Sequence, residues 1–220
     1  MTMMRHPAAP LLLMLSLASS IGMAQSGEAP TLPVRVLSQS PADSVTDLQI
    51  FCLFRSSPVN ALHGALVETD DKLHGILHEL RLPTLFEGEL GETVLLTPPP
   101  GTLAAKRVLI IGLGDSQTFT PERMHLVGKI AMTEAERLGV AHPFFAPTVL
   151  DGGVTRYTTD QMAFQVVRGF RDALATERLL RSKGAAGDPV VVDFTYLAGV
   201  KFAETTQSGV DQALGKASTR

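Results

Sequence analysis

The sequence predicts an α/β protein, built as a three-layer α/β/α sandwich around a mixed central sheet. Strand-like segments alternate along the chain with amphipathic helical segments, and stacking the helices on both faces of one sheet buries their apolar sides. The composition is that of a globular domain, with 45% hydrophobic and 19% charged residues in a chain of 220. This length suits one domain, which we place at residues 32–200.

Six segments have the pattern of strands. They are residues 32–37, 47–54, 92–97, 106–111, 143–150 and 190–196. The second and fourth are nearly continuous apolar runs, typical of strands that are covered on both faces. Pro147 interrupts the fifth segment, and we therefore predict that it lies near an edge of the sheet.

Four segments have the pattern of helices: residues 70–80, 120–138, 158–182 and, more weakly, 203–215. Asp70 and Asp71 open the first, whose apolar residues recur at the spacing of one helix face. Thr120 is the expected N-cap of the second, with Pro121 in its first turn. Thr158 is the expected N-cap of the third. Its predicted buried face consists of Ala163, Val166, Val167, Phe170, Ala173 and Leu174.

Residues 1–24 have the pattern of a secretory signal peptide. Arg5 precedes an apolar core at 11–18, and Gly22 and Ala24 supply the small residues of a cleavage site after Ala24. The core is shorter than the roughly 20 residues that span a membrane, although an uncleaved anchor is the alternative interpretation. We therefore expect a secreted or periplasmic protein, with residues 25–31 as a tether and no membrane attachment after cleavage.

The charge balance and the single cysteine exclude several classes of function. The chain has 19 Lys and Arg against 22 Asp and Glu, a net charge of −3, which argues against binding to nucleic acid. One cysteine excludes an internal disulfide and a cysteine-rich zinc site. Because Cys52 lies in an apolar segment, we expect it to be buried as a small hydrophobic residue.

Several segments together resemble the N-terminal domain of the leucyl aminopeptidases, the cytosol aminopeptidase family. The segments are Phe86–Gly91, Arg107–Gly114, Thr120–Met124 and Gln165–Phe170, and the resemblance covers roughly residues 33–200. It implies a macro-domain-like fold and a non-catalytic role in packing within a hexamer. The family's peptidase chemistry uses two divalent metals held in a second, C-terminal domain. Two-metal hydrolysis needs converging oxygen ligands, which this sequence does not offer, so we expect no enzyme activity and no cofactor.

His74 and His78 are a weak candidate for a metal site. They stand four residues apart on the helix expected at 70–80, a spacing that places both imidazoles on one face, as a zinc site requires. A solvated polar face is the alternative interpretation. The family resemblance gives this helix no metal role, and we expect no bound metal.

Three short segments are candidates for small-molecule binding. Gly112, Gly114 and Asp115 connect a strand to a helix, where backbone amides can bind phosphate, although we favour a structural turn as their role. Comparison with macro domains that bind ADP-ribose adds Asn60 and the pair Gly152 and Gly153, which a polar connection also explains.

The sequence leaves several functions open. The first is a secreted, non-catalytic domain that associates with itself or with another protein. The second is a macro-type module that binds ADP-ribose or a similar nucleotide. The third is an accessory part of a two-metal aminopeptidase whose catalytic half is on another chain. A zinc-binding or hydrolytic protein that uses His74 and His78 is the last.

Overall fold

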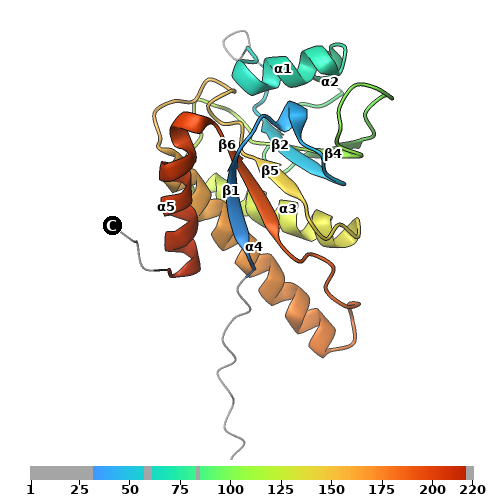
Figure 1. The fold of residues 1–220 in the computed structure, drawn as a ribbon, viewed down its shortest axis with the longest axis vertical. Helices are drawn as coiled ribbons and strands as arrows, with labels where there is room; N and C mark the ends of the chain where they lie inside the picture. The colour runs from blue at the N-terminus through green and yellow to red at the C-terminus, as the bar shows by residue number, and fades with distance from the viewer. Residues whose placement is uncertain (1–31, 57–60, 83–84, 217–220) are drawn as a thin grey trace, which may run out of the picture.

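The computed structural model describes residues 32–56, 61–82 and 85–216, which form a three-layer α/β/α sandwich (Figure 1). One six-stranded sheet has the order β1-β6-β5-β2-β4-β3. The strands are β1 (Val34–Ser38), β2 (Gln49–Leu53), β3 (Thr93–Leu96), β4 (Val108–Gly112), β5 (Phe144–Ala146) and β6 (Phe194–Ala198). The α-helices are α1 (Gly64–Lys72), α2 (Ile76–Leu80), α3 (Arg123–Arg137), α4 (Thr159–Ser182) and α5 (Ala203–Leu214). Short 3₁₀ helices, η1 (Pro41–Asp43) and η2 (Val200–Phe202), follow β1 and β6.

The sheet is mixed, as predicted. β3 runs antiparallel to β4 at one edge, whereas every other neighbouring pair of strands is parallel. β2 and β4 are buried along their whole length, which agrees with their continuous apolar sequences.

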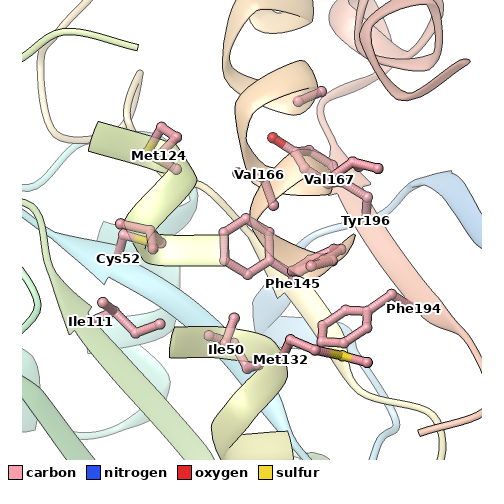
Figure 2. Packing of buried hydrophobic residues seen from close by; sticks show 14 of the residues in the cluster. Ile50, Cys52, Ile111, Met124, Met132, Phe145, Val166, Val167, Phe194 and Tyr196 are labelled. Carbon is pink, nitrogen blue, oxygen red and sulfur yellow. The ribbon is translucent and has the colours of Figure 1, made fainter. Parts of the chain in front are cut away.

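Side chains of the central strands alternate between two apolar layers. Ile50 and Cys52 of β2 face the larger layer, which is covered by α3, α4 and α5 (Figure 2). Phe51 and Leu53 face the smaller layer under α1 and α2. The buried face predicted for α4 is confirmed, since all six of its residues are buried in the larger layer.

Glycines let the three helices of the larger layer approach one another closely. A Cβ atom at Gly128 of α3 would overlap the backbone of Val166 in α4, and one at Gly169 of α4 would overlap the backbone of His125. Gly209 of α5 meets the backbone of Asp160 in the same way. The helix expected near the C-terminus is therefore packed on α4, and its residues Val210 and Ala213 are buried.

The helix expected at 70–80 is wrong in its boundaries and continuity. α1 begins at Gly64, so Asp70 and Asp71 lie in its last turns rather than at its start. Positive φ angles of 58° at His74 and 87° at Gly75 end α1 and separate it from α2. The Asp70 carboxylate then accepts hydrogen bonds from the amides of Leu77 (2.7 Å) and His78 (3.2 Å), and so satisfies the first turn of α2.

The edge position predicted for the strand at 143–150 is also wrong. β5 lies inside the sheet, between β2 and β6. Pro147 follows the last paired residue, Ala146, so its missing N–H costs the sheet no hydrogen bond.

The starts of α3 and β6 also differ from the prediction. The N-cap of α3 is Glu122 rather than Thr120. β6 begins at Phe194 rather than at residue 190, because the amides of Val190 and Val191 donate to the carboxylate of Glu136 (2.9 and 3.3 Å) instead of to a strand. Among the described residues, no helix combines the length and the apolar character needed to span a bilayer.

Candidate functional site

A pocket of about 440 Å³ opens at the carboxyl ends of β1, β5 and β6. Its walls come from the segments that follow these strands and from the first turns of α1, α4 and α5. The principal segments are residues 38–41, 146–151 and 196–200. In open α/β sheets this edge is where ligands bind, because loops from several strands converge there.

Thr148 separates β5 from β2 at the floor of this pocket. The ladder between the two strands ends at Phe51 and Ala146. Beyond it, the Thr148 hydroxyl accepts from the Cys52 amide (2.9 Å) and donates to the Cys52 carbonyl (2.6 Å). A buried side chain thus replaces the next strand residue, and the main chain after β5 turns away from the sheet.

Asp151 connects the loop after β5 to the start of α1 through hydrogen bonds. Its Oδ1 accepts from the Ala65 amide at 2.9 Å, and its backbone carbonyl accepts from the His63 amide at 2.9 Å. Gly64 has a φ of 50°, and a Cβ atom there would overlap Asp151 Oδ1. Burial raises the pKa of the Asp151 carboxyl, although the Ala65 amide opposes this shift. The N-terminus of α1 is therefore occupied by a carboxylate of the chain itself.

Tyr196 lines the pocket and carries a buried hydroxyl. The residue is only 1% exposed, and its hydroxyl has no hydrogen-bond partner among the described residues. Thr159 also lines the pocket, and its buried hydroxyl likewise has no hydrogen-bond partner among the described residues. Figure 2 shows Tyr196 beside Phe145 in the larger layer. Burial raises the pKa of Tyr196, so its hydroxyl stays protonated and can donate.

The predicted phosphate loop is a tightly packed turn outside the pocket. The amides of Gly112 and Gly114 donate to the carbonyls of Glu92 and Gly88, both at 2.8 Å. A Cβ atom at Gly112 would overlap the backbone of Glu89, so close approach of the main chain requires this glycine. Asp115 Oδ1 accepts from the Gln117 amide (2.8 Å) within the same turn. A ligand role for these residues stays a prediction.

Gly152 and Gly153 lie next to the pocket without lining it. A Cβ atom at Gly152 would overlap the ring of Phe54, and Gly153 has a φ of 85° in a turn closed by its hydrogen bond to Leu150. Asn60 lies outside the described residues. A ligand role for these three residues also stays a prediction.

His74 and His78 do not share a helix face. His74 lies in the break between α1 and α2, whereas His78 belongs to α2. Within residues 32–56, 61–82 and 85–216, no group of three or more His, Cys, Asp or Glu side chains is placed to hold a metal ion.

Thr148, Asp151 and Tyr196 are not among the site residues that the sequence predicts. Asp151 precedes the Gly-Gly pair that drew attention to this loop, and that is the one signal the sequence offered. Thr148 and Tyr196 stand in ordinary strand-like surroundings, and their roles follow from how β5 and β6 end.

Comparisons with known proteins agree with this architecture. The model of the cytosol aminopeptidase family, N-terminal domain, matches residues 51–183. A search of curated protein sequences found no match. A mutant of tomato leucine aminopeptidase superposes with a TM-score of 0.56 at 19% identity, covering 86% of this chain and 37% of the tomato chain.

Macrodomains superpose equally well. An Oceanobacillus iheyensis macrodomain mutant has a TM-score of 0.58 at 13% identity, with 86% of this chain and 97% of the other covered. The Trypanosoma brucei macrodomain in complex with ADP-ribose has a TM-score of 0.55 at 16% identity, with 83% and 69% covered. At such low sequence identities, these superpositions show a common fold and nothing more. The chain spans little more than a third of the tomato enzyme, and the family model that it matches is the one for the N-terminal domain. The chain therefore belongs to the cytosol aminopeptidase family and has that family's macrodomain-like N-terminal fold.

Proposed function

We propose that the described part of the chain is a non-catalytic domain, and that this domain associates with a second copy of itself. The observation that carries the proposal is an exposed apolar strip beside the edge strand β3. The strip consists of Leu90, Leu95 and Leu126, which are 38%, 46% and 40% exposed. Large side chains that stay exposed together mark protein contact surfaces more often than isolated ones do.

The position of the strip supports this proposal. Leu95 pairs with Leu109, which faces the larger apolar layer, so Leu95 lies on the same face of the sheet and remains largely exposed there. Gly91 packs against the side chains of Leu126 and Ile130, which brings the chain next to Leu90 onto α3. The outer hydrogen-bonding edge of β3 pairs with no strand of the described sheet, and such an edge can receive another chain.

The lack of peptidase activity in these residues is part of the proposal. The family match is to the N-terminal domain alone, and the described side chains provide no cluster of metal ligands. The alternative is that the domain associates with a different chain, one that carries the catalytic half of a two-metal aminopeptidase. Export through a cleaved signal at residues 1–24 is likewise proposed, from the pattern of the sequence.

Sedimentation velocity over a concentration series tests the association. We expect a dimer or larger assembly, and we expect Leu95→Lys and Leu126→Lys each to weaken it at least tenfold, because a charge would be buried at the contact. Leu179→Lys is the matched control, since Leu179 is 59% exposed near the end of α4. A monomer at every concentration, or equal weakening by the control, contradicts the proposal.

An activity assay tests the non-catalytic part. We expect the purified chain to show no hydrolysis of leucyl peptides with Mn²⁺ or Zn²⁺ added. Hydrolysis that co-purifies with the chain and is lost with it contradicts this part, whatever the state of assembly.

A further inference from the structure

We propose that the pocket at the carboxyl ends of β1, β5 and β6 binds an amphiphilic primary amine, a molecule with an apolar body, a protonated amino group and a hydrogen-bond acceptor. This proposal is independent of self-association, because the pocket and the β3 strip share no residue.

The size and walls of the pocket fit a small, largely apolar molecule. Its volume of about 440 Å³ falls within the ~300–1,000 Å³ of typical ligand sites. Met162 and Leu197 are buried in its wall. Val200 and Phe202 of η2 line it while remaining 83% and 41% exposed, so a bound apolar body would cover surface that now faces water.

The charges that line the pocket select against an anion. Glu68 and Asp151 are its acidic residues, and no Lys, Arg or His is among the described residues that line it. The phosphates of ADP-ribose would face these carboxylates without a compensating cation, whereas an ammonium group would pair with them.

Both carboxylates are positioned before any ligand arrives. Asp151 Oδ1 is fixed by the Ala65 amide, and Glu68 Oε2 accepts from the Ser40 hydroxyl at 2.7 Å. The neighbouring cation, Lys72, lies 2.6 Å from Asp43 Oδ1 but 3.9 Å from Glu68 Oε1, so its closer partner is Asp43.

The acceptor on the ligand is inferred from two buried donors. Tyr196 and Thr159 both line the pocket, and their hydroxyls are buried with no hydrogen-bond partner among the described residues. Leaving a buried hydroxyl unpaired is costly, and a ligand acceptor would remove that cost.

Tyramine and three relatives test the proposal on the unmodified protein by isothermal titration calorimetry. Tyramine carries an ammonium group and a phenol oxygen. 4-Ethylphenol lacks the amine, phenethylamine lacks the phenol oxygen, and 3-(4-hydroxyphenyl)propionate replaces the amine by a carboxylate. We expect tyramine to bind at least about tenfold more tightly than each relative, with the carboxylate weakest. Absence of saturable tyramine binding at millimolar concentration, or tighter binding of ADP-ribose, overturns the proposal.

Isosteric variants locate the contacts. Glu68→Gln combined with Asp151→Asn removes both negative charges but keeps an acceptor oxygen at each position. We therefore expect the double variant to lower the affinity for tyramine about tenfold and to leave the affinity for 4-ethylphenol unchanged. Tyr196→Phe should weaken tyramine and 4-ethylphenol without weakening phenethylamine, and it should not lower the melting temperature, because the hydroxyl has no partner to lose. Asp188→Asn, at an exposed site, is the matched control. Unaltered tyramine binding in either pocket variant, or an equal loss in the control, overturns the assignment.

Discussion

Thr148 adopts a backbone conformation that β-branched residues rarely take, with a φ of 47°. Such a conformation persists where the surroundings stabilise it, and here both hydrogen bonds to Cys52 do so. One strained residue thus ends a strand pair inside the sheet and gives the pocket its floor. The sequence does not reveal this, because a threonine after a strand is ordinary until its partner is known.

Thr148→Ala should lower the free energy of unfolding by about 2 kcal/mol, since the buried N–H and C=O of Cys52 lose their partner. Chemical denaturation measures the change. Thr155→Ala, an exposed position on the same loop, is the control and should be within about 0.5 kcal/mol of the unmodified protein. An equal stability of Thr148→Ala and the unmodified protein would contradict the role given to this hydroxyl.

The Asp151 carboxyl should contribute less to the stability of the protein at neutral pH than in mild acid. Burial raises its pKa in the folded state, so the native protein binds the proton more strongly than the unfolded chain does. This contribution to stability is therefore lost as the pH rises through the folded pKa. Asp151→Asn should melt at an equal or higher temperature at pH 7, and the difference should shrink as the pH falls towards about 4. Calorimetry at several pH values measures this, and a difference that grows in acid would show the opposite sign.

Cys52 should be unreactive in the native protein. Its burial follows from its apolar neighbours, as the sequence predicted, and burial raises the pKa of the thiol well above its ordinary value. Alkylation followed by mass spectrometry should therefore be slow in native buffer and fast in denaturant. Rapid labelling without unfolding would show that the core opens locally around β2.

At the scale of elements, periodicity predicted the long helices well and the short ones poorly. The buried face of α4 repeats over several turns, so its pattern is unambiguous. In contrast, α1 and α2 are separated by a break at residues 73–75 that keeps the apolar spacing almost intact. The break depends on the left-handed conformations of His74 and Gly75, which hydrophobic spacing does not encode.

The contact between α3 and α4 gives a prediction in which two effects have opposite signs. Helix propensity alone favours alanine over glycine by roughly 1 kcal/mol. A Cβ atom at Gly128 or Gly169, however, would overlap the backbone of the facing helix. The free energy lost by separating the two helices should exceed the free energy gained from the higher helix propensity of alanine. Each Gly→Ala variant should therefore be destabilised by roughly 1–3 kcal/mol.

Thermal unfolding of these two variants checks that balance. Gly187→Ala is the control, because a Cβ atom there meets no neighbour within 4 Å. We expect the control to be neutral or slightly stabilised. Stabilisation of Gly128→Ala or Gly169→Ala would show that the helices can move apart at little cost.

At the scale of the molecule, the alternation of strands and helices was sufficient to predict the layers, whereas the candidate site could not be predicted. The strand order places the segments after β1, β5 and β6 together, although the first lies more than 100 residues before the other two in the sequence. Local spacing drew attention instead to Gly112 and Gly114, whose surroundings are an equally compact turn. A site formed by the ends of distant strands becomes visible only when the pairing of those strands is known.

The pairing of β1 with β6 also has a consequence for biosynthesis. Val34 aligns with Phe194, and β1 pairs with no other strand of the described sheet. During translation, β1 must wait until β6 has emerged from the ribosome before it finds its neighbour. A nascent chain that stalls before residue 194 therefore leaves β1 without its neighbouring strand and exposed to chaperones and proteases.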